Sequence, residues 1–107
     1  MQYEILLLNI FKGKTDKGRQ YYRLGYVFLE DFMIADGDNF IGDTEHNVYV
    51  QDDVFKYLDK GSIYKKFTLV GEMKQDYKNP LNQIFVPIKL IDKKNNYEIN
   101  LSNEKPV

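Results

Sequence analysis

The first 30 residues have the apolar and polar spacing of two β-strands joined by a turn. Residues 3–11, YEILLLNIF, are apolar on both alternating faces, which predicts a strand covered on both sides. A polar turn bracketed by Gly13 and Gly18 follows, and residues 19–29 then alternate strictly. We expect the core side of this second strand to carry Tyr22, Leu24, Tyr26 and Phe28, and its other side Arg19, Tyr21 and Arg23.

The middle of the chain predicts less regular structure. Gly25 lies within the second strand, where a glycine often marks a bulge or bend that lets a long strand curl into a barrel. Residues 30–45 mix acids with glycines and apolar residues, which predicts a long loop with a short strand or turn. Residues 46–50 predict a short third strand, and residues 53–58 a brief helix capped by Asp52 and ended near a glycine.

The second half of the chain predicts a hairpin. Residues 63–73 form the fourth predicted strand and residues 83–91 the fifth. The loop at residues 74–82 joins them and contains the turn residues Asn79 and Pro80. Alternation places Ile63, Phe67 and Leu69 on one face of the fourth strand, opposite Tyr64, Lys66 and Thr68, and turns Ile84, Val86, Ile88 and Leu90 of the fifth inward.

The order of these elements predicts the fold class. Pro87 has no N–H to donate, so we expect a free edge or a bulge in the fifth strand. The tail after Asp92 has room for one extra strand at residues 97–101. Strand-strand-strand-helix-strand-strand is the order of the five-stranded oligonucleotide-binding Greek-key barrel. We therefore predict one all-β domain of this class over residues 1–107, with an acidic loop at 30–45 and a short C-terminal tail.

Composition narrows the possible classes of function. The chain has 107 residues, 43% hydrophobic and 29% charged, as expected of a soluble globular domain rather than a disordered chain. It has no Cys, which excludes disulfides, thiolate metal sites and cysteine nucleophiles. No apolar run approaches the roughly 20 residues of a membrane span, and the start lacks the basic end of a signal peptide. We therefore expect a cytoplasmic protein, in the host cytoplasm if a phage encodes it, with no membrane partner.

Charge is distributed unevenly along the chain. The formal net charge is −1, but residues 30–53 hold eight acids and no Lys or Arg. The rest of the chain then has fifteen basic residues against eight acids. Two surfaces of opposite sign follow, and the local potential matters more for binding than the net charge.

Positive charge interleaved with tyrosine marks the candidate binding surface. It is richest in the hairpin at residues 12–23 and recurs at the start of the fourth strand and in the loop at 74–82. In the oligonucleotide-binding barrel, strands two and three and the loops after strands one and four carry the ligand. Basic side chains release counterions from phosphates, and tyrosine stacks on bases, although the same residues also keep a hairpin tip and a sheet edge soluble. The candidate nucleic-acid-binding residues are Lys12, Lys14, Lys17, Arg19, Tyr21, Arg23, Tyr64, Lys66, Tyr77 and Lys78.

Motifs for catalysis and metal binding fail on inspection. A calcium loop counted from Asp36 would need glycine at position six, and it comes at seven, so a solvated loop is favoured over a two-carboxylate metal or glycosidase site. His46 is the only His, which leaves a zinc site or a triad without partners and favours a structural or solvent-facing role. Residues 13–15, Gly-Lys-Thr, lack the upstream glycine and following helix of a P-loop. We expect no enzyme, no metal and no cofactor.

Three segments carry a resemblance to a known family. KGRQYYRL at residues 17–24, YLDKGSIYKKFTL at 57–69 and QIFVPIKL at 83–90 resemble the small single-stranded-DNA-binding proteins of phages and plasmids, in particular the helix-destabilising proteins of filamentous phages. The resemblance implies a barrel that forms a homodimer and coats single strands cooperatively without sequence preference. Residue by residue, it favours Arg19, Tyr21, Arg23 and Tyr77 as contacts.

The sequence leaves three functional hypotheses, from different classes. The first is a sequence-nonspecific single-stranded-DNA-binding protein of phage or plasmid replication or transfer, with RNA as the alternative strand. The second is a protein-interaction or inhibitor module that uses the acidic residues 30–53 to imitate nucleic acid or to meet a basic partner. A small hydrolase of carboxylate or metal type is a third reading, which lacks candidate bases.

Overall fold

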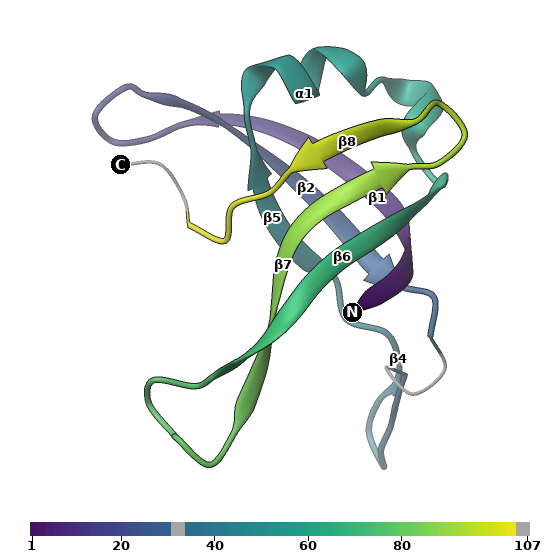
Figure 1. Cartoon of the computed structure of the whole chain (residues 1–107), viewed down its shortest axis with the longest axis vertical. Helices are drawn as coiled ribbons and strands as arrows, with labels where there is room; N and C mark the ends of the chain where they lie inside the picture. The colour runs from purple at the N-terminus through teal and green to yellow at the C-terminus, as the bar shows by residue number, and fades with distance from the viewer. Residues whose placement is uncertain (31–33, 105–107) are drawn as a thin grey trace.

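One antiparallel sheet accounts for most of the chain in the computed structural model, which describes residues 1–30 and 34–104 (Figure 1). Its strands are β1 (Gln2–Lys14), β2 (Gln20–Phe28), β5 (His46–Val50), β6 (Lys66–Gln75), β7 (Gln83–Asp92) and β8 (Tyr97–Asn100). They lie in the order β5-β2-β1-β6-β7-β8, and the sheet is strongly curled. Strands β1, β2 and β5 follow one another, and β6 returns beside β1, which is a Greek key. The predicted all-β, barrel-like class is confirmed.

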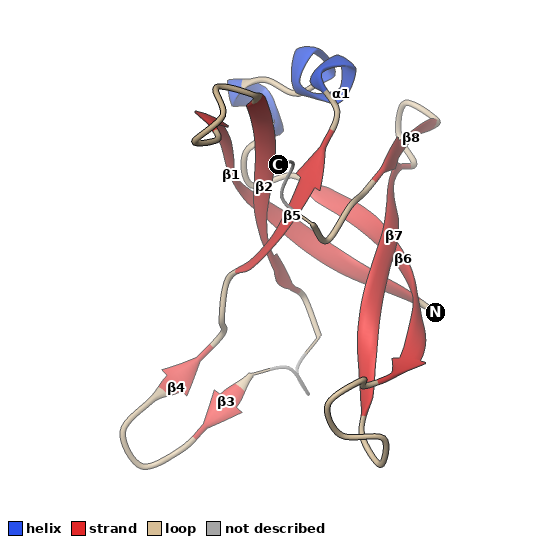
Figure 2. Cartoon of the chain, turned by 90° about the vertical axis from the view of Figure 1, so that its left-hand side faces the viewer, coloured by secondary structure: helices blue, strands red, loops and turns tan. Residues whose placement is uncertain are grey.

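A sixth strand extends the predicted five and helps to close the barrel. The extra strand expected in the tail is present as β8, which pairs with β7. Just after β8, Ser102 and Tyr49 exchange two backbone hydrogen bonds of 2.8 Å each, and the N–H of Leu101 donates to the carbonyl of Ile88 at 2.9 Å. The segment that follows β8 thus joins the β7 side of the sheet to β5 (Figure 2). In the described part of the chain, this closing seam between β5 and the segment after β8 consists of one residue pair, Tyr49 and Ser102.

The helical segment covers one end of the barrel, at the top of Figure 1. It consists of α1 (Asp52–Tyr57) and the 3-10 turn η2 (Lys60–Ser62), between β5 and β6. Val54 and Leu58 are buried and belong to the core. The helix therefore closes the end of the barrel by apolar contact.

The boundaries of the helix differ from those predicted. Asp52 is the first helical residue, and Gln51 takes the N-cap position without a side-chain capping bond. The carboxylate of Asp53 instead accepts the N–H of Val54 at 2.9 Å. Gly61 lies in the 3-10 turn, after the helix has ended. The predicted cap at Asp52 is wrong by one position.

A bulge at Leu8 interrupts the pairing of β1 with β2. Leu7 is opposite Tyr26 and Asn9 is opposite Gly25, so Leu8 has no partner in β2. An extra residue of this kind bends a strand and increases its twist. The bend expected near Gly25 is therefore present, although the extra residue belongs to β1.

The bulge also exchanges the two faces of β1. Leu7 faces the core before it, whereas Ile10 packs against the core after it. Phe11 is therefore turned to the outer face and is 43% exposed. It lies opposite Arg23, while Ile10 lies opposite the buried Leu24.

The core contains most of the residues that alternation assigned to it. Of the predicted core residues, Leu24, Tyr26, Phe28, Phe67 and Leu69 are buried, and Ile63 is half-buried against the core. Tyr22 is only half-buried, and Thr68, predicted to share the outer face with Lys66, is buried. The core is made of Ile5, Leu7, Leu24, Tyr26, Phe28, Val48, Val54, Leu58, Phe67, Leu69, Leu90 and Ile99.

The predicted inward face of β7 is correct at Leu90 and wrong further towards the start of the strand. A bulge beside Pro87 leaves Ile88 without a partner in β6, as the missing N–H of proline led us to expect. A register shift of one residue exchanges the two faces of a strand, and Phe85 packs against the core in place of Ile84. The other predicted inward residues, Ile84, Val86 and Ile88, are exposed or half-buried.

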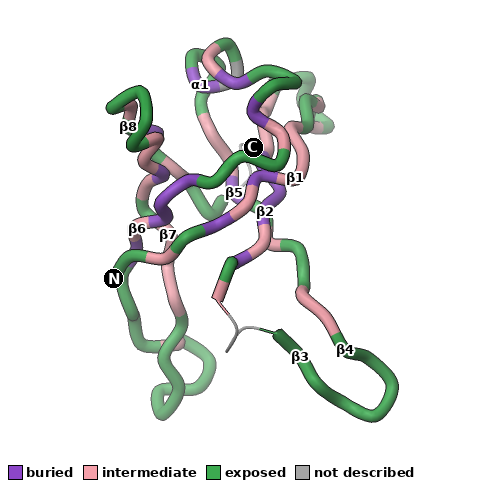
Figure 3. Tube along the Cα trace, turned by 90° about the vertical axis from the view of Figure 1, so that its right-hand side faces the viewer, coloured by how far each residue is buried: buried purple, intermediate pink, exposed green. Residues whose placement is uncertain are grey.

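The acidic stretch forms a small hairpin outside the barrel. Its strands β3 (Ala35–Asp36) and β4 (Ile41–Gly42) pair only with each other and are largely exposed (Figure 3). This agrees with the prediction of a loop with a short strand or turn. Residues 31–33 of the stretch, including Asp31, lie outside the described residues.

Asp92 holds the turn between β7 and β8 together. Its carboxylate accepts the hydroxyl of Tyr57 at 2.8 Å, the amide of Asn95 at 2.9 Å and the N–H of Lys94 at 3.2 Å. Desolvation opposes ionisation, but these hydrogen bonds outweigh it and hold the pKa of Asp92 below its usual value. The Tyr57 ring also stacks on Tyr97, with centroids 3.9 Å apart.

Changing Tyr57 to Phe should raise the pKa of Asp92 towards its usual value. A carboxyl whose pKa is depressed by folding contributes stability above its unfolded pKa, near 3.9, and loses it as the pH falls through the folded pKa. Urea unfolding at pH 7 and pH 3 should therefore show a smaller acid-induced loss of stability for Tyr57→Phe than for the unsubstituted protein. Tyr77→Phe, at a fully exposed site, is the control. Equal losses in all three proteins would contradict the assignment.

Candidate nucleic-acid interface

Three aromatic rings lie together on the outer face of β1, β2 and β5. Phe11, Tyr21 and Tyr49 form this aromatic platform. The Tyr21 centroid is 6.2 Å from that of Phe11 and 5.9 Å from that of Tyr49. Strand pairing places Phe11, Arg23 and Tyr49 in one row across the three strands. Strand alternation thus turns Tyr21 and Arg23 outward, as predicted.

Arg23 is held against the platform by a cation–π contact. Its guanidinium carbon is 4.6 Å from the centroid of Phe11. Its Nε is buried, and this atom has no hydrogen-bond partner among the described residues. An arginine in this position offers donors to an anion that binds over the rings. Phosphate and carboxylate are the groups that its planar fork matches.

Gly13 provides the flat seat on which Tyr21 rests. The two residues are directly opposite each other in β1 and β2. A Cβ on Gly13 would lie 2.7 Å from the end of the Tyr21 ring and 2.9 Å from Phe11. The absence of a side chain therefore allows the ring to lie over the backbone.

A hydrogen bond fixes the other end of this face. The amide of Asn9 donates to the carboxylate of Glu45 at 2.5 Å. The bond passes over Gly25, where a Cβ would collide with both side chains. It ties the segment before β5 to the bulged part of β1, so the platform has a fixed boundary on this side.

A hollow of about 470 Å³ adjoins the platform. Strand β2, strand β5 and the segment after β8 line it together. Its volume is within the range of small-ligand pockets. Its lining combines two of the platform rings, Tyr21 and Tyr49, with polar and charged side chains. The lining residues are Arg19, Gln20, Tyr21, Tyr22, Tyr49, Val50, Gln51, Asp52, Asn100, Leu101, Ser102 and Glu104.

The basic hairpin projects beyond the platform and has a well-formed turn. The N–H of Thr15 donates to the carbonyl of Arg19 at 2.8 Å, and the hydroxyl of Thr15 accepts the N–H of Arg19 at 3.1 Å. Gly18 has a φ of 81°, which glycine adopts without strain. Lys17 and Arg19 are exposed at this tip.

Two of the predicted lysines lie on the reverse side of the hairpin. Lys12 is opposite Tyr22 and Lys14 is opposite Gln20. Directly opposite residues in an antiparallel pair share a face. Both lysines therefore face away from Tyr21, although they still contribute positive charge to the projecting ribbon.

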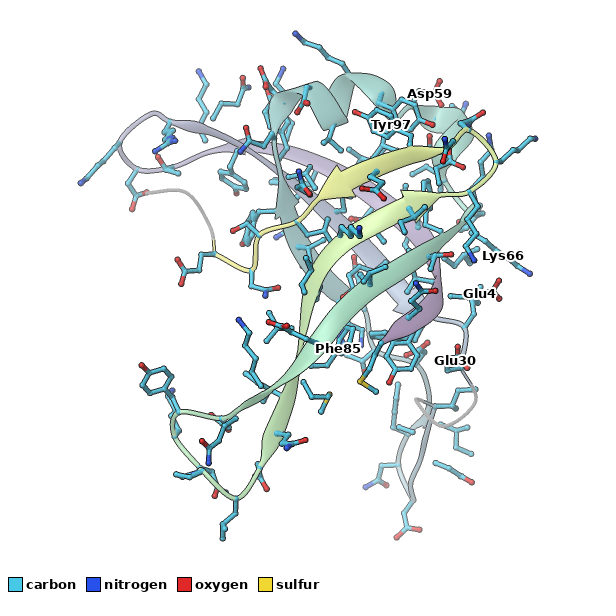
Figure 4. All side chains as sticks on the ribbon, in the orientation of Figure 1. Glu4, Glu30, Asp59, Lys66, Phe85 and Tyr97 are labelled. Carbon is cyan, nitrogen blue, oxygen red and sulfur yellow. The ribbon has the colours of Figure 1, made fainter. Side chains whose placement is uncertain are left out.

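The remaining predicted residues lie elsewhere. Tyr64 was predicted to lie in the fourth strand, and this is wrong: it lies in the turn before β6, with a φ of 66°. Lys66 begins β6 on the right of Figure 4, beside Glu4. Tyr77 and Lys78 are in the β6–β7 loop, at the lower left of Figure 1, while the β1–β2 tip is at the upper left. The structure thus divides the ten candidates among three places.

Two residues of the platform were absent from the predicted set. Phe11 was read as the end of an apolar strand, because the bend expected near Gly25 did not indicate that β1 carries the extra residue. Tyr49 lies between Val48 and Val50 in a short strand. Its alternation with the buried Val48 is the signal that could have revealed it.

The described residues offer no metal site and no membrane-spanning helix. In residues 1–30 and 34–104, no group of three or more His, Asp or Glu side chains could hold a metal ion. The His46 ring stacks on Tyr26 and meets Phe28 edge-on, so its role is structural. None of the helices in the described part of the chain has the length and apolar character to cross a membrane.

Comparison of the chain with protein-family models, with curated proteins and with solved structures finds no match. Function is therefore inferred from the chemistry of the surface itself.

Changing Gly13 to Ala should displace the Tyr21 ring while leaving the fold intact, because the added Cβ would meet that ring at 2.7 Å. The measurement is the set of proton NOEs between the rings of Phe11 and Tyr21, which should weaken or vanish. The melting temperature should change by no more than a few degrees, as for a surface substitution. Gly37→Ala is the matched control, since its Cβ would make an ordinary contact of 3.6 Å. Unchanged NOEs in Gly13→Ala would show that the seat does not position Tyr21.

Proposed function

We propose that this chain binds single-stranded DNA without sequence preference, through the aromatic platform and the basic β1–β2 hairpin. The observation that carries the proposal is the grouping of Phe11, Tyr21 and Tyr49 with Arg23 on the outer face of β1, β2 and β5. This is the face with which oligonucleotide-binding barrels engage their ligands. Aromatic rings stack on any base, and cations meet the phosphates between them.

The division of charge supports the same proposal. The basic hairpin projects at the top of Figure 1, whereas the acidic β3–β4 hairpin projects at the bottom. Charges separated by more than about 8 Å are largely screened at physiological salt. The acidic hairpin can therefore coexist with a bound strand on the platform. The biological setting in this proposal is the replication or transfer of a phage or plasmid inside the cell.

Association of two copies is part of the proposal. The β6–β7 hairpin exposes Met73, Leu81 and Ile84, with Leu81 95% exposed. Apolar side chains in this position favour contact with another chain. Sedimentation velocity at micromolar concentration distinguishes a homodimer from a monomer.

Fluorescence anisotropy with labelled oligo-dT tests the binding itself. Affinity should fall steeply as salt rises, because phosphate contacts release counterions, with a slope of about −0.7 in log–log form for each contact. Single-stranded RNA and duplex DNA of equal length are the comparison ligands. No anisotropy change at tens of micromolar protein in low salt would overturn the proposal.

Replacing Tyr21 by Ala should cost about 1–3 kcal/mol of binding, the usual contribution of one stacked base. The neighbouring Tyr22→Ala is the matched control, because Tyr22 is half-buried on the opposite side of β2. It should lower the melting temperature more than Tyr21→Ala and weaken binding less. If Tyr22→Ala weakens binding and Tyr21→Ala lowers the melting temperature, the ligand binds the Tyr22 side of β2 and the proposed face is wrong.

The rival function has one observation in its favour. The acidic hairpin exposes Phe40 and Ile41, at 54% and 73%, beside its carboxylates. Acids around exposed apolar side chains suit a basic protein partner, as a nucleic-acid mimic would need.

Changing Asp36, Asp38 and Asp43 together to Asn separates the two functions. If the platform binds DNA, single-strand affinity should rise modestly, and the gain should fade with salt because it is a long-range electrostatic effect. Anisotropy titrations at low and high salt measure this. Loss of DNA binding with the melting temperature unchanged would mean that these carboxylates belong to the binding site.

A further inference from the structure

Four lysines meet at the end of the sheet where β6 begins and β7 turns into β8. Lys66 begins β6 and Lys65 directly precedes it, while Lys93 and Lys94 belong to the β7–β8 turn. Two adjoining hollows, of about 230 and 170 Å³, bring them together. These four residues are called the lysine patch. All four are exposed.

The patch has a local excess of positive charge. Its acidic neighbours are Glu4 and Asp92, which line the same hollows. Hydrogen bonds from Tyr57, Asn95 and the turn already occupy the carboxylate of Asp92. In the described part of the chain, the two ion pairs that lysines form are Lys74–Glu72 and Lys89–Glu98, both outside the patch. The four ammonium groups are therefore available to an external anion.

Tyr64 adds an exposed ring next to these charges. Its backbone has a φ of 66°, in the left-handed region that residues other than glycine rarely adopt. Two backbone hydrogen bonds hold the segment against β1, from the N–H of Tyr64 to the carbonyl of Leu7 at 2.7 Å and from the N–H of Leu7 to the carbonyl of Lys65 at 3.1 Å. The Tyr64 ring is 72% exposed. The backbone that carries this exposed ring is thus fixed directly before Lys65 of the lysine patch.

We propose that the lysine patch is a second contact surface for single-stranded nucleic acid, which holds backbone phosphates while Tyr64 stacks on a base. The patch is at the opposite end of the sheet from the β1–β2 tip, as the position of Lys66 in Figure 4 shows. A strand long enough to leave the platform would therefore meet the protein a second time. The inference rests on the proposed function, because both surfaces take the same ligand.

The chemistry of the patch favours phosphate over a protein partner. The cores of protein interfaces are depleted in lysine and enriched in apolar and aromatic groups. Apart from Tyr64, the apolar residues around the patch belong to the barrel wall: Phe67 is buried, and Ile91 is half-buried. Flexible ammonium groups on an exposed turn instead suit the point-like charge of phosphates.

The test compares the triple variant Lys66→Gln, Lys93→Gln and Lys94→Gln with the unsubstituted protein. Binding is measured by anisotropy with an oligo-dT of about 6 nucleotides, near the small end of the site size of one barrel, and with one of about 30, well beyond it. The triple variant should bind the short strand with unchanged affinity and salt slope. On the long strand its salt slope should become shallower by up to about 2, at roughly 0.7 for each lost phosphate contact.

A matched control removes the same charge elsewhere. Lys56, Lys74 and Lys89, changed together to Gln, should leave the difference between long and short strands intact. If the triple variant has a much lower melting temperature than the unsubstituted protein, Lys93→Gln alone replaces it in the test, with an expected slope change of about 0.7. Equal salt slopes for variant and control on the long strand would overturn the inference.

Two outcomes keep this test separate from the test of the platform. If Tyr21→Ala leaves binding of the short strand unchanged, the platform fails, whatever the lysine patch does. If the triple variant instead weakens self-association without DNA, with unchanged slopes, the patch binds protein. The acidic β3–β4 hairpin of a second copy is then the complementary surface, and the proposal is wrong.

Discussion

The outer face of this barrel depends on one unpaired residue in its central strand. Because Leu8 has no partner in β2, β1 turns Leu7 inward before the bulge and Phe11 outward after it. Without the extra residue, Phe11 would face the core, and Arg23 would lose the ring beneath its guanidinium. The same bulge lies beside Gly25, where the open space admits the bond between Asn9 and Glu45. Curvature of the sheet and exposure of the platform thus have a common cause.

Most of the fold could be predicted from the sequence because its strands alternate regularly. The faces of β2 and the inward Phe67 and Leu69 of β6 followed from a period of two. The largest changes of face lie where a bulge shifts that period by one residue, at Leu8 in β1 and at Ile88 in β7. Pro87 gave a chemical signal for the second bulge. Gly25 indicated the first bulge only through the partner strand, so the sequence did not show that the extra residue belongs to β1.

The candidate site was predicted only in part, for a related reason. Charge and tyrosine content are local properties, and strand alternation correctly placed Tyr21 and Arg23 on the outer face beside the hairpin. Which basic segments share a surface is a property of the folded sheet. Lys66 begins β6, whereas Tyr77 lies in the β6–β7 loop at the other end of that strand. Neither end of β6 adjoins the platform (Figure 1). Segments that share the same basic and tyrosine-bearing pattern in this sequence therefore lie on separate surfaces of the folded protein.

The closing seam of the barrel gives the molecule an uneven stiffness. Between β5 and the segment after β8, the two backbone bonds of Tyr49 and Ser102 replace the longer ladders found between the other neighbouring strands. Tyr49 is also a platform residue, and Ser102 lines the adjoining hollow. A change in the spacing of β5 and the segment after β8 would therefore break only these two bonds in the described part of the chain. If the platform binds single strands as proposed, the wall beside the ligand could adjust to bases of different size at a small cost in hydrogen bonds.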